Sequence, residues 1–254
     1  LLCLFVVNSR NTAQPIYIDH CSFINNTVDS SPSTANVVHD ADSIGGGAGL
    51  GFKCPNSNNG LLAHIFECLF QDNHNNRNGG GFQAGHKMEF VTMKFDIDTC
   101  TFEGNEALNG NGGAISIETI DSWEIRNCHF NSNRAKCGGA IYINTTIEND
   151  DYLNGASIFS GNTFSNNDAT EKQGTFIYID GINSNEDRII YVPITIDETN
   201  VFTNTGEEGS EIYNRWKNLI INGVTFQSSE TLTKKRFRAL ETAQNGITTI
   251  TGCT

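Results

Sequence analysis

The chain has 254 residues and a formal net charge of −13 at pH 7, so it would repel a phosphate backbone, and no nucleic-acid partner is expected. Charged residues make up only 18% of the chain, beside 25 glycines and four prolines, which is typical of many short strands and tight turns rather than long amphipathic helices. No apolar run approaches the roughly 20 residues that a helix needs to cross a bilayer, so no membrane span is expected in this segment.

The first predicted element is a strand over residues 1–7. This segment has no starting Met, no basic region and no small-residue cleavage site, so it does not match a signal peptide. We expect residues 5–8, Phe-Val-Val-Asn, to occupy the place that residues 141–144, Ile-Tyr-Ile-Asn, occupy in a later repeat.

The next segment introduces a phrase that recurs along the chain. An apolar strand at residues 16–19 is followed by Cys, then by x-Phe-x-x-Asn. Further along, the first residue of the phrase is Cys or Asn, and one looser copy has Val there. The copies lie at residues 21–26, 68–73, 100–105, 128–133 and 162–167, with partial copies at 200–202 and 224–226.

A second phrase, Gly-Gly-Ala-Ile, opens the strand after each inner Phe. Clear copies lie at residues 112–117 and 138–143, with looser relatives at 79–82, 174–179 and 209–213. In the first repeat a polar insertion, residues 29–43, delays the phrase to residues 45–48. We expect this insertion to be displayed as a variable loop.

Together the two phrases predict an all-β, right-handed parallel β-helix of about eight coils. Successive inner phenylalanines are separated by between 24 residues (Phe202 to Phe226) and 47 residues (Phe23 to Phe70), which suits a solenoid whose turns accept insertions. Each strand then pairs with its equivalents one coil above and below, so like residues stack.

Stacking gives each repeated residue a structural role. Phe fills the interior, Cys acts as a small buried hydrophobe, Asn holds a left-handed corner and bonds to its neighbour's backbone, and Gly-Gly forms a tight corner. The predicted ladder residues are Cys21, Cys68, Cys100, Cys128, Phe23, Phe70, Phe102, Phe130, Phe164, Asn73, Asn105, Asn133 and Asn167.

The eight cysteines do not predict a disulfide framework. Asn162, Asn200 and Val224 replace Cys at equivalent rungs, which favours free stacked thiols, although two neighbouring rungs could be oxidised if their geometry allows. Cys3, Cys54 and Cys137 lie off this register, and the sequence does not pair them.

Residues 1–254 are expected to be one β-helix segment of a longer chain, cut within a coil at both ends. The last residues, 247–254, match the strand before each inner Phe and stop one residue short of it. Since an uncapped coil exposes strand edges, we expect neighbouring coils or identical subunits to cover both ends.

The paired phrases resemble the repeats of the chlamydial polymorphic outer-membrane proteins and of similar surface proteins in protists. The best matches join residues 102–105 with 112–115, and 130–133 with 138–141; the resemblance loosens after about residue 170. It implies an extracellular or cell-surface β-helical passenger, often adhesive, with a glycan or host-surface ligand as partner.

Few residues point to chemistry. Asn144 and, less favourably, Asn25 begin sequons for N-glycans. Lys94, Asp96 and Asp98 should point outward together, but adjacent coils are expected to add mainly neutral polar residues. The remaining charged runs fit solvated loops: the acidic runs at 148–151 and 207–208 and the basic run at 234–238. The histidines, such as His20, His86 and His129, fit structural or surface positions, so no metal or cofactor is expected.

The leading hypothesis is therefore a non-enzymatic structural or adhesive rod that carries N-glycans and assembles end to end into a filament. The alternative is a carbohydrate-active β-helix enzyme, either a polysaccharide lyase or a glycosidase, which would need clustered carboxylates on one face.

Overall fold

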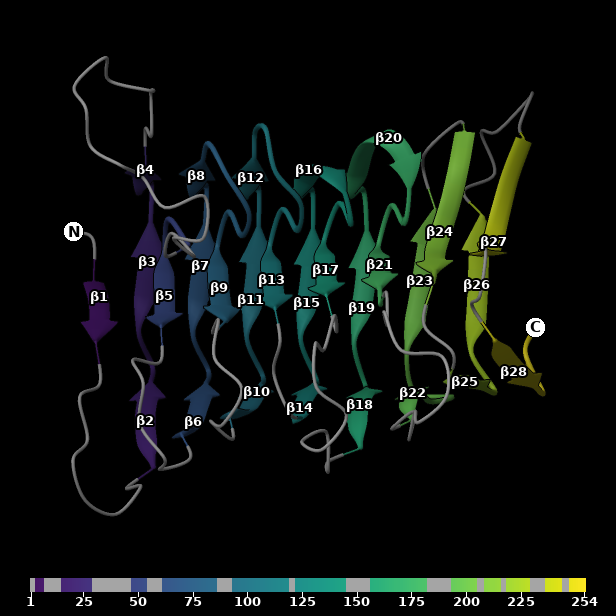
Figure 1. The fold of residues 1–254 in the computed structure, drawn as a ribbon, viewed down its shortest axis with the longest axis horizontal. Helices are drawn as coiled ribbons and strands as arrows, with labels where there is room; N and C mark the ends of the chain where they lie inside the picture. The colour runs from purple at the N-terminus through teal and green to yellow at the C-terminus, as the bar shows by residue number, and fades with distance from the viewer. Residues whose placement is uncertain are drawn as a thin grey trace.

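The computed structural model confirms a right-handed parallel β-helix. It describes residues 3–6, 15–28, 47–53, 61–85, 93–118, 122–144, 156–181, 193–204, 208–215, 218–228, 236–243 and 247–254. In these residues every strand pairing between coils is parallel, and the strands form four sheets that run along one axis (Figure 1). No described helix is long and apolar enough to cross a membrane.

Two sheets have eight strands each. Sheet A consists of β1 (Cys3–Val6), β5 (Leu50–Lys53), β9 (Phe82–Gly85), β13 (Ile115–Glu118), β17 (Ile141–Asn144), β21 (Ile177–Asp180), β24 (Glu208–Asn214) and β27 (Arg236–Thr242). Sheet B consists of β2 (Ile16–Asp19), β6 (Leu61–Phe66), β10 (Met93–Asp98), β14 (Ser122–Arg126), β18 (Ser157–Ser160), β22 (Ile194–Ile196), β25 (Leu219–Asn222) and β28 (Thr248–Thr251).

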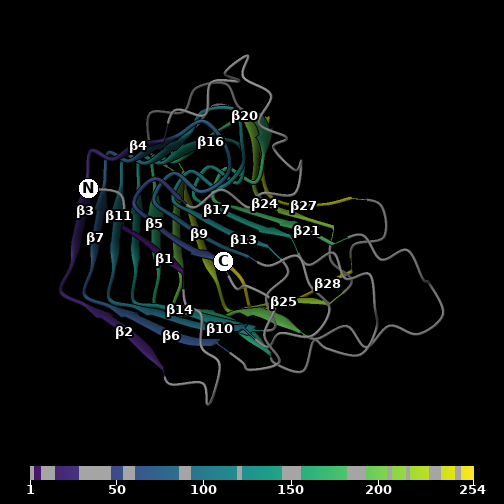
Figure 2. The ribbon, with the colours of Figure 1, turned by 60° about the vertical axis from the view of Figure 1, so that its left-hand side comes forward.

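Two shorter sheets complete the coil. Sheet C consists of β3 (Ser22–Ile24), β7 (Leu69–Gln71), β11 (Thr101–Glu103), β15 (His129–Asn131), β19 (Thr163–Ser165), β23 (Val201–Asn204) and β26 (Thr225–Ser228). Sheet D consists of β4 (Thr27–Val28), β8 (His74–Asn75), β12 (Glu106–Ala107), β16 (Arg134–Cys137) and β20 (Asp168–Gln173). The chain visits the sheets in the order B, C, D, A, and Figure 2 shows sheets B and C as two adjoining walls.

The predicted phenylalanines stack in one column inside the coil. Each Phe of sheet C lies directly opposite the Phe of the next coil, and the ring centroids of Phe70 and Phe102 are 4.6 Å apart with an interplanar angle of 3°. The spacing between neighbouring rings stays between 4.6 and 5.3 Å along the column. The column comprises Phe23, Phe70, Phe102, Phe130, Phe164, Phe202 and Phe226.

The asparagines three residues after each Phe form a second, polar ladder. Asn105 is fully buried; its Nδ2 donates to the Phe70 carbonyl and to Asn133 Oδ1, each at 2.9 Å. Its own Oδ1 accepts from the backbone N and the Nδ2 of Asn73. The amide therefore satisfies backbone groups that the corner leaves without a sheet partner. Asn26, Asn73, Asn133 and Asn167 take part in the same ladder.

The left-handed corner residue is not the predicted one. The ladder Asn was predicted to adopt the left-handed conformation, but the positive φ belongs to the residue before it. The φ angles of these residues lie between 51° and 64°: Asn25, Asp72, Gly104, Ser132 and Asn166. Turning the chain one residue earlier directs the ladder Asn inward. Its amide can then reach the next coil, while the corner side chain faces outward.

The first strand is also shifted relative to the prediction. Cys3 lies opposite Leu50, and the same register leads through Phe82 and Ile115 to Ile141. Cys3, not Phe5, is therefore the equivalent of Ile141. A shift of two residues preserves the inward and outward alternation, so the hydrophobic pattern alone cannot distinguish the two registers.

The cysteine rungs hold free thiols. Cys68, Cys100 and Cys128 are buried, and Cys21 and Cys253 are partly buried at the two ends of the described ladder. Each Sγ donates to the carbonyl two residues earlier, as in Cys128 to Arg126 at 3.0 Å. Hydrogen bonding between successive thiols, together with burial, raises the pKa of Cys68 and Cys100 far above the ordinary 9.0, which keeps these thiols protonated and unreactive.

Candidate functional site

The outward carboxylates predicted on β10 lie in a charged network on sheet B. Phe95 and Ile97 point into the core, and Asp96 and Asp98 point outward with the exposed Lys94. Asp96 lies opposite His64 of β6 and Glu124 of β14. The prediction that adjacent coils add mainly neutral polar residues was therefore wrong. We call His64, Asp96, Asp98, Glu124 and Arg126 the sheet B network.

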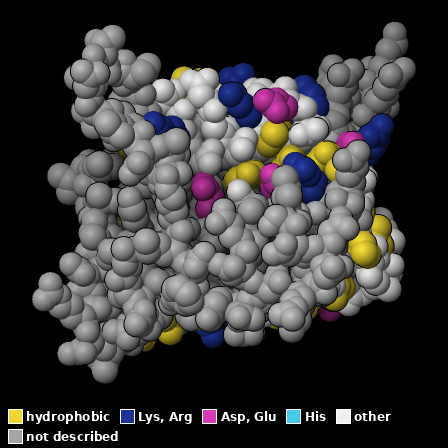
Figure 3. Space-filling view, viewed as in Figure 1, with side chains coloured by type: hydrophobic (Ala, Val, Ile, Leu, Met, Phe, Trp, Pro, Cys, Tyr) yellow, Lys and Arg dark blue, Asp and Glu magenta, His cyan; other side chains and the backbone are white. Residues whose placement is uncertain are grey.

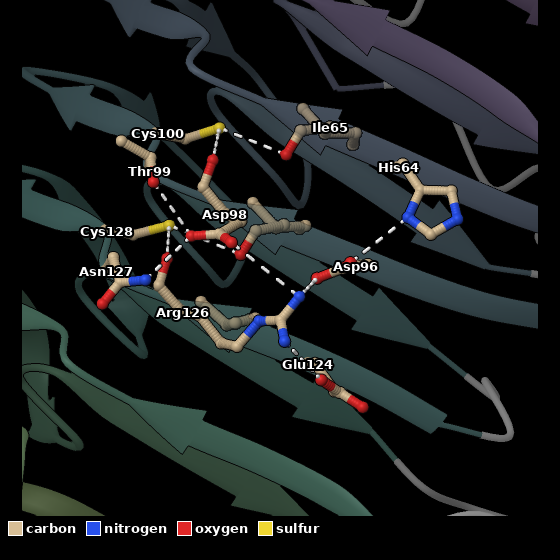
Figure 4. A network of polar contacts seen from close by, with 12 residues as sticks. His64, Ile65, Asp96, Asp98, Thr99, Cys100, Glu124, Arg126, Asn127 and Cys128 are labelled. Carbon is tan, nitrogen blue, oxygen red and sulfur yellow. Dashed lines mark hydrogen bonds and ion pairs between the residues drawn. The ribbon is translucent and has the colours of Figure 1, made fainter.

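One arginine holds this network together (Figure 4). Arg126 Nη2 lies 2.7 Å from Asp96 Oδ1 and 3.8 Å from Asp98 Oδ2, and its Nη1 lies 3.1 Å from Glu124 Oε2. His64 Nδ1 lies 3.2 Å from Asp96 Oδ2, so both oxygens of Asp96 are occupied. Asp98 Oδ1 in turn accepts from Thr99 Oγ1 and Asn127 Nδ2.

The electrostatics favour a structural role for these carboxylates. Burial would lower the pKa of Arg126, but the negative charges of Asp96, Glu124 and Asp98 outweigh it and raise the pKa of the guanidinium above its ordinary value. The arginine therefore stays charged and keeps the carboxylates paired. A general acid or base must exchange its proton with a substrate, and Asp96 directs both oxygens at protein groups instead.

Three tyrosines form a row on the outer face of sheet A. Tyr142, Tyr178 and Tyr213 lie opposite one another on β17, β21 and β24. Their ring centroids are 5.6 and 4.8 Å apart, and each residue is at most 8% exposed. Burial raises the pKa of Tyr178 to about 12, so the phenol stays protonated at neutral pH.

Charged and polar residues flank this tyrosine row. Glu118, Asn144 and Asp180 occupy the next outward position on three successive strands, and Arg215 Nη1 lies 3.3 Å from Asp180 Oδ1. Figure 3 shows yellow, magenta and blue side chains gathered over β17, β21 and β24.

One of these carboxylates is the acceptor for three donors. Glu118 Oε1 accepts from Asn78 Nδ2 at 2.8 Å, Ser116 Oγ at 3.2 Å and Gln83 Nε2 at 3.3 Å. Neither Glu118 nor any residue of the tyrosine row was predicted from the sequence. The signal was present: in Ile-x-Ile-x, both residues written x point outward from the same strand, and each lies opposite the equivalent x of the next coil.

The two predicted glycosylation positions differ in exposure. Asn25 is exposed at the corner between sheets C and D, with φ of 54°. Asn144 ends β17 and is partly buried. Residues 145–146 of its sequon lie outside the described residues. Other predicted positions also lie outside the described residues: the insertion at 29–43, the acidic run at 148–151, Cys54 and His86. The same holds for the side chains of Cys3 and of residues 207–208 and 234–237.

Other predicted positions have defined surroundings. Cys137, which the sequence did not pair, is a buried free thiol whose Sγ lies 3.5 Å from Glu171 Oε2. Burial, and after it the negative charge of Glu171, raise the pKa of this thiol to about 12. His129 Nδ1 lies 2.6 Å from Thr163 Oγ1 of the next coil. Among the described residues, no three His, Cys, Asp or Glu side chains are grouped to hold a metal ion.

Comparison with known proteins gives one family. Residues 99–118 and 127–144 each match the model of the Chlamydia polymorphic membrane protein repeat. The matches cover β11 to β13 and β15 to β17, which are the C, D and A strands of two consecutive coils. No curated protein and no solved structure matches the chain. The chain therefore carries the Chlamydia polymorphic membrane protein repeat in two consecutive coils of a right-handed parallel β-helix.

Proposed function

We propose that this chain is a non-enzymatic surface protein whose β-helix serves as a structural or adhesive rod. The observation that carries the proposal is the repeat match, because the family is named for membrane proteins. The fold supports it: the repeated Phe, Cys and Asn residues are used inside the coil, and the carboxylates of the sheet B network are bound by Arg126 and His64.

A surface location can be tested on the cells that make the protein. Antibodies raised against the folded chain should label intact cells, and external protease should remove the label. An internal protein of the same cells must stay protected from the protease, as the control. Labelling that appears only after permeabilisation would contradict the proposal.

The second candidate is a carbohydrate-active enzyme, and the observation that favours it is the pair of carboxylates, Glu118 and Asp180, beside the tyrosine row. Glu118 and Asp180 lie two coils apart, about 10 Å between their backbones at normal strand spacing. This is close to the separation of roughly 6.5–9.5 Å between the carboxyl groups of inverting glycosidases. Polysaccharide depolymerisation that is lost in Glu118→Gln but retained in Asp96→Asn would favour the enzyme.

N-glycans belong to the same proposal if the chain passes through a eukaryotic secretory route. We expect Asn25 to be modified more completely than Asn144, because Asn25 is exposed and Asn144 is partly buried. Peptide mass spectrometry of native material measures both occupancies, with Asn25→Gln and Asn144→Gln as matched controls. Full occupancy at Asn144 with none at Asn25 would reverse this ranking.

Assembly along the axis is the remaining part of the proposal. The described strands of all four sheets pair along one axis, so a neighbouring coil or an identical subunit would extend the sheets by the same backbone pairing. Electron microscopy of native material would distinguish a filament from a solitary rod.

A further inference from the structure

Three buried cysteines lie on successive coils, directly before the strands of sheet C. We call Cys68, Cys100 and Cys128 the thiol row; each is at most 2% exposed. The backbone holds them in register, because Thr101 N donates to the Cys68 carbonyl and His129 N donates to the Cys100 carbonyl, each at 2.9 Å. The cysteines therefore recur at the strand spacing of about 4.8 Å.

The sulfurs of the thiol row share one orientation. Each Sγ donates to the carbonyl two residues earlier in the chain, at 3.2, 3.2 and 3.0 Å in the order of the row. Cys100 Sγ also lies 3.6 Å from the Ile65 carbonyl, and Cys128 Sγ lies 3.6 Å from the Ile97 carbonyl. Figure 4 shows Cys100 and Cys128 with these repeated contacts. Since the contacts repeat from coil to coil, the sulfurs stack as the strands do.

The spacing suits a metal ion that takes two ligands on opposite sides. A metal–thiolate bond is about 2.3 Å long, so two sulfurs on either side of one ion lie roughly 4.6 Å apart. Adjacent strands are separated by nearly the same distance, about 4.8 Å. Zinc needs four ligands around one point, which a row does not supply. Thiolates select soft ions such as Cu(I), and Cu(I) accepts two ligands in a line.

We propose that the thiol row binds Cu(I), with one ion in each gap between successive sulfurs. Filling the two gaps breaks three S–H bonds, forms four Cu–S bonds and releases three protons to solvent, while copper keeps its oxidation state. Cys100 then bridges both ions. The backbone N of Cys68 lies 3.4 Å from Cys100 Sγ and donates to it, which stabilises the bridging thiolate.

The ion must compete with protons for the same sulfurs. Hydrogen bonding between neighbouring thiols, and then burial, raise the pKa of Cys68 and Cys100, so binding should tighten as the pH rises. The path from solvent is short, because the residue directly before each thiol is exposed at the corner between sheets B and C: Glu67, Thr99 and Asn127. No metal was expected from the spacing of the histidines, but this donor set needs no histidine.

The chain itself supplies a conservative replacement for the cysteines. Asn162 and Asn200 occupy the equivalent positions of the next two coils. Cys128 N donates to Asn162 Oδ1 at 3.0 Å, and Asn162 N donates to Asn200 Oδ1 at 3.2 Å. Cys128→Asn therefore extends an existing run by one coil, and Cys100→Asn places the same residue type one coil earlier. Both variants should keep the fold, which circular dichroism checks.

The test incubates the purified 254-residue chain with Cu(I) buffered by bicinchoninate under anaerobic conditions and counts the bound copper after desalting. The unmodified chain should hold about two ions more than Cys100→Asn and about one more than Cys128→Asn, because both gaps share Cys100. Cys137→Ser removes a buried thiol outside the row and should lose none. X-ray absorption of the loaded unmodified chain, which needs no variant, should show two sulfur neighbours for each copper.

Three results would overturn the inference. Equal copper in the unmodified chain and Cys100→Asn would place the ions elsewhere. A loss in Cys137→Ser as large as that in Cys100→Asn would mean that copper binds any buried thiol. Nitrogen neighbours, or three sulfurs around each copper, would exclude a linear ion between two stacked thiols.

Discussion

Replacing Phe102 with Ala should lower the free energy of unfolding by about 3–5 kcal/mol, among the largest losses expected from a single substitution in this chain. Phe102 is fully buried and stacks on both Phe70 and Phe130, at 4.6 and 5.1 Å. Its removal leaves a cavity in the middle of the column. Neighbouring rings are fixed by their own strands and cannot close it.

Phe226→Ala is the matched control for this prediction. Phe226 stacks on Phe202 at 5.3 Å and is only partly buried, so less apolar area and fewer ring contacts are lost. Urea denaturation should show a clearly smaller loss for Phe226→Ala. Because each coil contacts only its neighbours, Phe102→Ala should also broaden the transition by uncoupling the coils on either side. Equal losses at the two positions would argue against a column whose centre is its best-packed part.

The repeated interior could be predicted from the sequence because each coil imposes the same constraint on it. Phe102 and Phe130 must fill the same space one coil apart, so the same residue type returns wherever the phrase returns. The outward direction of Asp96 and Asp98 could be predicted from the inward and outward alternation along a strand. The free thiols were expected because Asn and Val replace Cys at equivalent rungs.

The outer surface could not be predicted in the same way, because it depends on which residues of different coils lie opposite one another. Asp96 meets Glu124 and Arg126 only once the register between β10 and β14 is known, and the loops between these strands vary in length. The two-residue shift of Cys3 and the corner turned by Asn25 instead of Asn26 are also invisible to the hydrophobic pattern, since neither changes which residues are apolar.

Glu211 is a further residue that departs from the apolar pattern of sheet A. It occupies the position that precedes the first inward Ile of sheet A, where other coils have Ala114, Ala140 and Phe176. The side chain is 1% exposed, and its Oε2 has no hydrogen-bond partner. An apolar position therefore holds a carboxyl group.

Burial should make this carboxyl group a source of pH-dependent instability. Desolvation raises the pKa of Glu211 from 4.5 to about 9, so the folded chain keeps the proton at neutral pH. The unfolded chain releases it above pH 4.5. The group's contribution to the free energy of unfolding is therefore fully present below pH 4.5 and declines by about 1.4 kcal/mol per pH unit up to about pH 9.

Glu211→Gln should abolish this decline. The amide cannot titrate and keeps a similar shape, so the variant should match the unmodified chain near pH 4 and exceed its unfolding free energy by roughly 3 kcal/mol at pH 7. Denaturation between pH 4 and 9 measures the difference, and Glu171→Gln, at an exposed site, should show no such slope. Parallel stability profiles for the Glu211→Gln variant and the unmodified chain would mean that Glu211 is ionised in the folded state and that its pKa is not raised by burial.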